Sequence, residues 1–111
     1  MKRYEVPVLT IVWNNRNYQT VRNNFAFYSK RMMATGNYYG MYLGAPDIDF
    51  VKLAESQGVR GERVTAPATL RQALQRGSAA VKAGEPYVIE VVVARVGPGA
   101  DSTWYQKYSA R

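Results

Sequence analysis

Two asparagines, Asn14 and Asn15, directly follow the first apolar run of the sequence, and Asn17 stands two positions further on. Side-chain amide oxygens and main-chain carbonyls are hard, neutral ligands, which Mg²⁺ accepts beside the oxygens of a phosphate. Open α/β sheets bind ligands beyond the carboxyl ends of their strands, so a polar turn at a strand end is a candidate site. Paired asparagines are also common in ordinary turns, so these residues alone do not establish a metal site.

The composition excludes several other kinds of chemistry. The 111 residues include no cysteine and no histidine. Thiolate metal sites, Ser-His-Asp and Cys-His nucleophiles and most zinc sites all need one of these two side chains. Chemistry must therefore come from carboxylates, amides, main-chain groups or a bound cofactor.

The elements that must position these asparagines are a strand and a helix. Residues 6–13 form a continuous apolar and β-branched run, which predicts a strand buried on both faces of a parallel sheet. Residues 14–17 predict a turn, because asparagines tolerate left-handed geometry and bond back to their own backbone. From residue 18 to about 30 the sequence predicts a helix with three apolar residues on one face: Val21, Phe25 and Tyr28.

Further elements follow in an alternating order. Residues 31–46, rich in glycine and aromatic side chains, predict a long loop. Asp47 or Asp49 is expected to cap a short helix that ends near Gly58. A short strand is expected over 61–65.

The last two expected elements are a helix and a strand. The helix opens at Pro67 and stops near Gly84, and the strand covers 86–94. The expected buried stripe of this helix consists of Leu70, Ala73, Leu74, Ala80 and Val81. Strands that alternate with helices predict an α/β fold, a three-layer α-β-α arrangement around a parallel sheet. We expect one domain over 1–95 and an aromatic tail over 96–111, in which Trp104, Tyr105 and Tyr108 dock on another surface.

Six patterns occur in order along residues 6–94. They are an apolar strand ending in Asn-Asn, a helix, D-F-V-K-L-A-E-x-x-G, G-x-R-V, L-x-x-A-L and P-x-x-I-E-V. This arrangement resembles the C-terminal half of the thiamine-diphosphate-binding, Rossmann-like domain in the acetolactate synthase and benzoylformate decarboxylase superfamily. The resemblance implies a site for thiamine diphosphate and Mg²⁺.

The resemblance also implies roles for individual residues. Asn15 would give a side-chain oxygen and Asn17 a main-chain carbonyl to Mg²⁺, and these two with Tyr18 would hold the cofactor. Asn14 would be structural. Thr20 and Val21 match positions that line the substrate pocket in relatives, although ordinary helix packing is an equal alternative for both.

Several residues depart from particular branches of the superfamily. Pyruvate decarboxylases carry a catalytic glutamate where this chain has Val21. Acetolactate synthases usually show glycine and methionine at the positions of Gln19 and Thr20, and often tryptophan at that of Asn24. The loop over 31–46 would match a mobile cover of the active site, or else pack at a subunit interface.

The site implied by this resemblance is incomplete within the sequence. The thirteen residues before Asn14 contain no Gly-Asp-Gly, the element whose aspartate is the other protein ligand of Mg²⁺ in the family. No catalytic residue is expected in this chain itself. We therefore expect a thiamine-diphosphate-dependent lyase or transferase that acts on 2-oxo acids, but only as a hetero-oligomer. A companion polypeptide would carry the Gly-Asp-Gly half and the pyrimidine-binding domain.

One alternative is a noncatalytic interaction or nucleic-acid-binding module derived from a truncated enzyme, and a nonfunctional gene fragment is the other. Fifteen Lys and Arg against eight Asp and Glu give a net charge of +7, which permits an anionic partner. The basic residues are scattered, so nucleic acid is the less favoured partner. We expect a cytoplasmic chain without a membrane anchor, because the apolar runs are far shorter than the roughly 20 residues of a bilayer span.

Overall fold

The computed structural model describes residues 1–28, 30–35 and 40–94, without the side chains of 25–27, 32, 33 and 35. The chain divides into two compact units. The sheet unit comprises Met1–Asn14 and Asp49–Val93, and the second unit, called the turn unit here, comprises the described residues of Asn15–Ile48 together with Ala94. The predicted aromatic tail over 96–111 lies outside the described residues.

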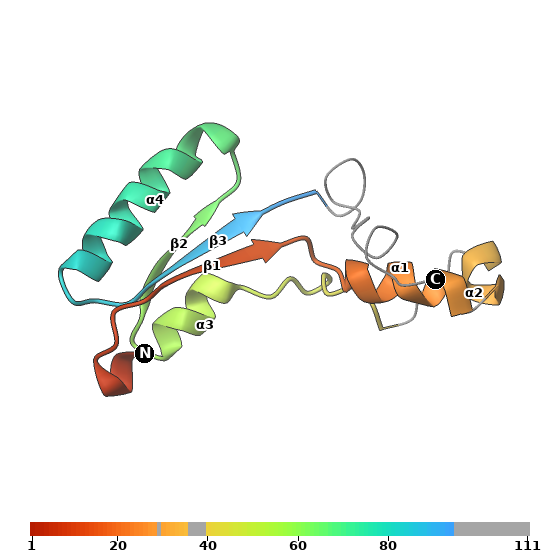
Figure 1. Ribbon diagram of the computed structural model, residues 1–111, viewed down its shortest axis with the longest axis horizontal. Coiled ribbons are helices and arrows are strands. Elements are labelled where there is room, and N and C mark those ends of the chain that lie inside the picture. Colours follow the sequence, from red (N-terminus) through yellow and green to blue (C-terminus); the bar gives the residue numbers. More distant parts are fainter. Residues whose placement is uncertain (29, 36–39, 95–111) are drawn as a thin grey trace, which may run out of the picture. The chain divides into compact units, whose positions relative to one another are not determined.

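The sheet unit contains three parallel strands, β1 (Leu9–Asn14), β2 (Arg60–Val64) and β3 (Tyr87–Val92). Their order is β1-β3-β2, with β3 in the middle (Figure 1). Leu9 of β1 and Arg60 of β2 both lie in register with Tyr87. The parallel sheet confirms the predicted α/β class.

Helix α4 (Pro67–Lys82) covers one face of the sheet. Its buried residues are Ala73, Gly77 and Ala80. The two alanines belong to the buried stripe that the sequence predicts, and Gly77 does not. A Cβ atom at Gly77 would lie 2.6 Å from Leu9 Cδ1 and 3.2 Å from Ile89 Cδ1, so this glycine allows α4 to approach the strands closely. The core beneath α4 consists of Val64, Ala73, Ile89 and Val91.

Helix α3 (Phe50–Ser56) packs on β2 and β3 from the opposite face, which completes the predicted three layers (Figure 1). Asp49 caps the helix, because its Oδ1 accepts a hydrogen bond of 2.9 Å from the Lys52 N–H. This backbone hydrogen bond, more than any other contact, lowers the pKa of the Asp49 carboxyl. Of the two aspartates that the sequence offers as caps, the structure uses the second.

Strand β1 differs from its prediction in two ways. It begins at Leu9, after a short 3-10 helix over Lys2–Tyr4, and it lies at an edge of the sheet. Ile11 and Trp13 remain 37% and 61% exposed. The prediction of a strand buried on both faces was therefore wrong for the described part of the chain. No described strand flanks the outer side of β1, and α4 packs mainly over the other two strands.

The turn unit contains α1 (Gln19–Tyr28) and α2 (Lys30–Thr35). Helix α2 occupies part of the segment that the sequence predicts to be a loop, so that prediction was wrong over 31–35. Val21 and Tyr28 are 42% and 83% exposed, so the predicted apolar face of α1 is not buried among the described residues. No helix in the described ranges is long and apolar enough to span a bilayer.

Candidate functional site

The turn after β1 is closed by an asparagine side chain. Asn15 Oδ1 accepts a hydrogen bond of 3.0 Å from the main-chain N–H of Asn17. Between them Arg16 adopts a left-handed backbone with φ of 55°. The back-bonding that the sequence predicts is present, but the left-handed residue is Arg16 and not an asparagine.

The segment from Met41 to Asp47 braces this turn from one side. The Tyr18 N–H donates to the Met41 carbonyl and the Leu43 N–H donates to the Arg16 carbonyl, both at 2.8 Å. Arg16 Nη2 also lies 2.9 Å from Asp47 Oδ2. The turn is therefore fixed by contacts that are distant in sequence.

These contacts determine which way the main chain of Asn17 faces. Asn17 and Tyr42 form an antiparallel bridge whose two hydrogen bonds are made by the neighbouring residues, Arg16 and Tyr18 on one side. In such a pair the N–H and C=O of the central residue both point away from the partner strand. The Asn17 carbonyl therefore faces the same side as its N–H, which is the side where Asn15 Oδ1 lies.

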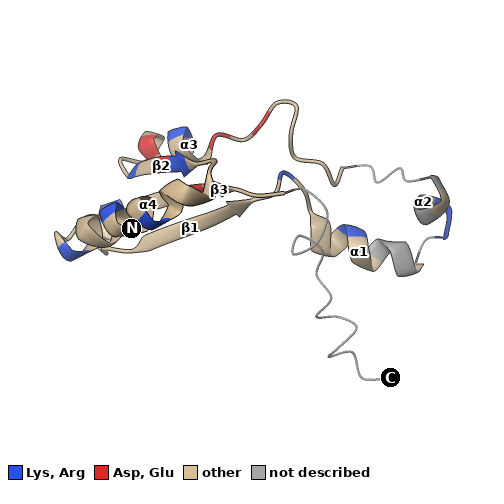
Figure 2. Cartoon of the chain, turned by 90° about the horizontal axis from the view of Figure 1, so that it is seen from above, with Lys and Arg blue, Asp and Glu red and all other residues tan. Residues whose placement is uncertain are grey.

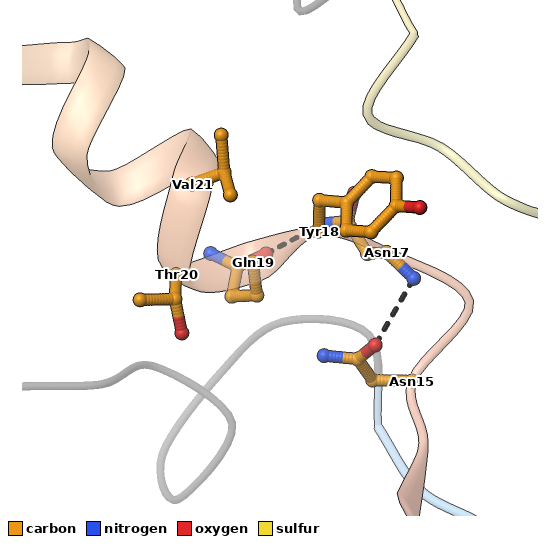
Figure 3. A pocket seen from close by; sticks show the side chains of 6 residues that line it. All are labelled: Asn15, Asn17, Tyr18, Gln19, Thr20 and Val21. Atoms are coloured by element: carbon orange, nitrogen blue, oxygen red, sulfur yellow. Dashed lines mark hydrogen bonds between the residues drawn. The ribbon is translucent and has the colours of Figure 1, made fainter.

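Six consecutive or near-consecutive residues line a pocket beside the turn (Figure 3). They include every site residue predicted from the sequence, together with one that was not: Asn15, Asn17, Tyr18, Gln19, Thr20 and Val21. The pocket has a volume of about 240 Å³, below the roughly 300–1,000 Å³ of complete small-molecule sites. The structure thus brings the predicted residues together around one pocket.

Gln19 is the lining residue that sequence reasoning missed. It is 7% exposed, and its Oε1 accepts a hydrogen bond of 2.6 Å from Asn17 Nδ2, while its Nε2 donates to Asn23 Oδ1 at 2.8 Å. These bonds fix the side-chain amide of Asn17. A polar residue two positions after Asn17 was the available signal.

Asn14 faces the sheet unit. Its Nδ2 donates a hydrogen bond of 2.6 Å to Glu90 Oε1, and Arg63 Nε donates to Glu90 Oε2 at 2.8 Å. Glu90 is fully buried in the central strand. A buried carboxylate is costly unless it is paired and hydrogen-bonded, so these two partners stabilise it and anchor the last residue of β1. Glu90 is the charged residue within the apolar run over 87–94, and the sequence prediction gave it no role.

Comparison with known proteins identifies the family in which this asparagine turn occurs. Residues 1–91 match the family described as "Thiamine pyrophosphate enzyme, C-terminal TPP binding domain". The chain belongs to the thiamine pyrophosphate enzyme family. The matched part contains β1, the asparagine turn and most of the strand that carries Glu90. This membership confirms the resemblance found in the sequence and does not favour a nucleic-acid-binding module.

Individual relatives agree with this family. Probable acetolactate synthase large subunits from Methanococcus aeolicus and Methanocaldococcus jannaschii are 32% and 30% identical over 107 and 94 residues, which cover 90% and 84% of this chain. A solved thiamine diphosphate-dependent 4-hydroxybenzoylformate decarboxylase from Rhodococcus jostii RHA1 is 36% identical over 83% of this chain, with a TM-score of 0.66. The chain spans only 16%, 14% and 16% of these three proteins, respectively.

The oxygen atoms of the turn fit, in part, the Mg²⁺ that a thiamine pyrophosphate enzyme would need. Asn15 Oδ1 has a second lone pair beyond its bond to Asn17, and the Asn17 carbonyl faces the same side, so two neutral oxygens are available to Mg²⁺. Among the residues that the structure describes, no three acidic, histidine or cysteine side chains cluster as a metal site. The turn therefore offers two neutral oxygens as candidate ligands of a cation.

Proposed function

We propose that this chain is the C-terminal cofactor-binding part of a thiamine-diphosphate-dependent enzyme that acts on 2-oxo acids. Asn15 through its side-chain oxygen, and Asn17 through its main-chain carbonyl, would hold Mg²⁺ for the cofactor's diphosphate, with Tyr18 beside them. The cofactor, when bound, supplies the carbanion chemistry next to a 2-oxo group. This chain's residues contribute binding and orientation.

One observation carries the proposal: two oxygen donors face one side of a turn that directly follows a parallel strand, in a chain of this family. Ligands of open α/β sheets bind beyond strand ends of this kind. The brace of Met41–Asp47 supports the proposal further, because metal sites need ligands that are held in place before the ion arrives.

The substrate would enter beside the same pocket. Thr20 and Val21 line it next to the two metal-binding residues, with Val21 42% exposed. The relatives named above are acetolactate synthase subunits and a 4-hydroxybenzoylformate decarboxylase, so a 2-oxo acid is the substrate class that we propose. Both a carboligase and a decarboxylase are consistent with this class.

A companion polypeptide would complete the enzyme. A Mg²⁺ that is held with a diphosphate would need charge and further ligands beyond two neutral oxygens. We propose that these come from a chain with the Gly-Asp-Gly half of the domain and with the pyrimidine-binding domain, in a hetero-oligomer. The pocket volume, which is that of a partial site, is consistent with this arrangement.

The test is reconstitution of the enzyme from its parts. The chain is co-expressed with a Gly-Asp-Gly-bearing candidate, purified through a tag on one partner, and assayed with pyruvate and benzoylformate plus thiamine diphosphate and Mg²⁺. We expect co-purification, and turnover that neither chain shows alone. Absence of co-purification with any such chain, or full turnover by the companion alone, would refute the proposal. Salt-dependent retardation of DNA or RNA by the isolated chain would support the alternative module instead.

A further inference from the structure

One carboxylate of the sheet unit lies where a carboxylate is costly. Glu90 is the charged residue of the central strand β3, and its side chain is fully buried. A buried ion pair is often no more stabilising than well-packed apolar side chains of similar volume, while loss of one partner leaves an uncompensated charge. The stability of the sheet unit alone therefore gives little reason for a carboxylate at this position.

The partners of Glu90 come from both neighbouring strands. Asn14 Nδ2 and Arg63 Nε each donate to one of its two carboxylate oxygens, at 2.6 and 2.8 Å. Glu90 lies in register with Arg63 and with Val12, two residues before Asn14, so the three polar side chains share one face of the sheet. Arg63 Nη2 also lies 3.4 Å from Asp49 Oδ1, at the start of α3. The network thus joins all three strands at this face.

The network ends at the residue that precedes the proposed metal ligand. The side chain of Asn14 is bonded to Glu90, and its carbonyl accepts a hydrogen bond of 3.0 Å from the Val93 N–H. The peptide group is planar, so the plane of the Asn14 carbonyl also contains the N and Cα atoms of Asn15. Contacts within the sheet unit therefore fix the point from which the Asn15 side chain extends.

We propose that Glu90 is a positioning residue of the cofactor site, which acts through Asn14 to hold Asn15 where its side-chain oxygen binds Mg²⁺. This inference rests on the function proposed above and adds to it a residue that supports the metal ligand from the sheet. Partners that orient a metal ligand commonly change metal affinity by about 10–100-fold when they are replaced. Because Glu90 acts through one further residue, the change should lie near the lower end of that range.

Two variants and their combination test this role in the reconstituted enzyme. Glu90→Gln keeps the size of the side chain but leaves one acceptor oxygen for two donors, and Asn14→Val removes a donor in favour of a residue type that suits strands. We expect each to raise the Mg²⁺ concentration for half-maximal activity by about 5–10-fold, with kcat at saturating Mg²⁺ and cofactor within about 2-fold. The double variant should be no worse than either single one, because both break the same contact.

Glu62→Gln is the matched control. It removes the same charge and also breaks a carboxylate–arginine pair, with Arg76 of α4, but Glu62 lies in register with Ile89 on the opposite face of the sheet. We expect its Mg²⁺ requirement to stay within about 2-fold. A similar rise for Glu62→Gln, or a full further effect of Glu90→Gln in the Asn14→Val background, would show a general effect of charge or stability and overturn the inference.

Amide hydrogen exchange of the unmodified complex gives a readout that decides the matter even if the variants do not fold. Coupling between two sites is reciprocal, so thiamine diphosphate with Mg²⁺ should slow exchange of the Val93 amide, which is bonded to Asn14. The Tyr87 amide, bonded to the Val8 carbonyl at the other end of the strand pair, is the internal control. Equal slowing of the two amides, or none at Val93, would contradict the inference.

The inference and the proposed function can fail separately. If Asn15→Ala raises the Mg²⁺ requirement but Glu90→Gln and Asn14→Val do not, the inference is wrong and the proposed function stands. If Asn15→Ala leaves the requirement unchanged, or if no Gly-Asp-Gly-bearing chain binds, both are wrong.

Discussion

At the scale of single residues, three asparagines in the turn serve different purposes. Asn14 is bonded to buried Glu90, Asn15 closes the turn with its side-chain oxygen, and Asn17 has its side chain tied to Gln19. In the proposed site, Asn15 would bind Mg²⁺ through its side-chain oxygen and Asn17 through its main-chain carbonyl. The two residues should therefore respond differently to substitution.

Replacement of Asn15 tests this difference. In the reconstituted enzyme, Asn15→Ala should raise the Mg²⁺ concentration for half-maximal cofactor binding by at least about 10-fold, because a ligand is lost. Asn15→Asp, which keeps an oxygen at the same place, should retain binding. Asn17→Ala keeps the main-chain carbonyl and should have a clearly smaller effect than Asn15→Ala. Equal losses for Asn15→Ala and Asn17→Ala in a Mg²⁺ titration would contradict the assigned ligands.

Substitution of Glu90 tests the buried hydrogen bonds that hold Asn14, the last residue of β1. Glu90→Ala removes the acceptor of both Asn14 and Arg63 from a fully buried position, so we expect the free energy of unfolding to fall by about 2–4 kcal/mol. Arg76→Ala breaks an ion pair in which the arginine side chain is 53% exposed and should cost at most about 1 kcal/mol. Denaturant unfolding measures both. A Glu90→Ala loss no larger than that of Arg76→Ala would contradict the account of the buried network.

At the scale of elements, the packing of α4 on the sheet depends on the absence of a side chain at Gly77. Gly77→Val would place methyl groups against Leu9, Ile89 and Tyr87, and we expect a loss of about 1–3 kcal/mol in the free energy of unfolding. Ser78→Val, one position along on an exposed site, should cost only a few tenths of a kcal/mol. Similar midpoints for the two variants in thermal unfolding would argue against close packing at this position.

The contact between α4 and β2 should also give a dependence on pH. A hydrogen bond from Arg76, aided by one from the Tyr87 hydroxyl, lowers the pKa of the Glu62 carboxyl below its ordinary value near 4.5. The stabilisation from this carboxylate is therefore complete above about pH 4.5 and is lost as the pH falls through the lower, folded-state pKa.

Glu62→Gln removes this titration. The difference in free energy of unfolding between the unmodified chain and Glu62→Gln should be constant from about pH 5 to 7 and shrink below that range. Denaturant unfolding across this range measures it. A difference that stays level or grows towards acid pH would show that the Glu62 contact does not titrate as described.

Local sequence patterns predicted most elements but not the contacts that join them. The apolar strands, the cap at Asp49 and the stripe with Ala73 and Ala80 follow from short-range periodicity and capping chemistry. The edge position of β1 could not be predicted, because a continuous apolar run is the same whether its neighbour lies in this sequence or in another. Helix α2 was missed because its sequence, Lys30–Thr35, has no apolar period over so few residues.

The candidate site was predictable only in part for the same reason. Asn15, Asn17, Tyr18, Thr20 and Val21 are close in sequence, so a strand-end turn brings them together. The brace from Met41 to Asp47 and the Asn14–Glu90 hydrogen bond join residues far apart in the chain. No local pattern predicts such pairs.

At the scale of the whole molecule, the distribution of charged side chains bears on the kind of partner that this chain binds. Several basic side chains are paired with acids, as in Lys2–Glu85, Arg16–Asp47 and Arg63–Glu90, and Figure 2 shows the lysines and arginines spread over several elements. Within the described ranges, this distribution is not the continuous basic stripe of a nucleic-acid-binding surface. The exposed edge strand β1 and the asparagine turn are consistent with the proposal that this chain is one part of a larger enzyme.

The most direct test of the central claim is to locate the metal ion within the chain. Mn²⁺, a paramagnetic substitute for Mg²⁺, is titrated into the complex of the isotope-labelled chain with its companion, with and without thiamine diphosphate. The account predicts that the amide signals of Asn15, Arg16, Asn17 and Tyr18 broaden first, and only when the cofactor is present. Broadening that begins elsewhere in the chain, or that ignores the cofactor, would contradict it.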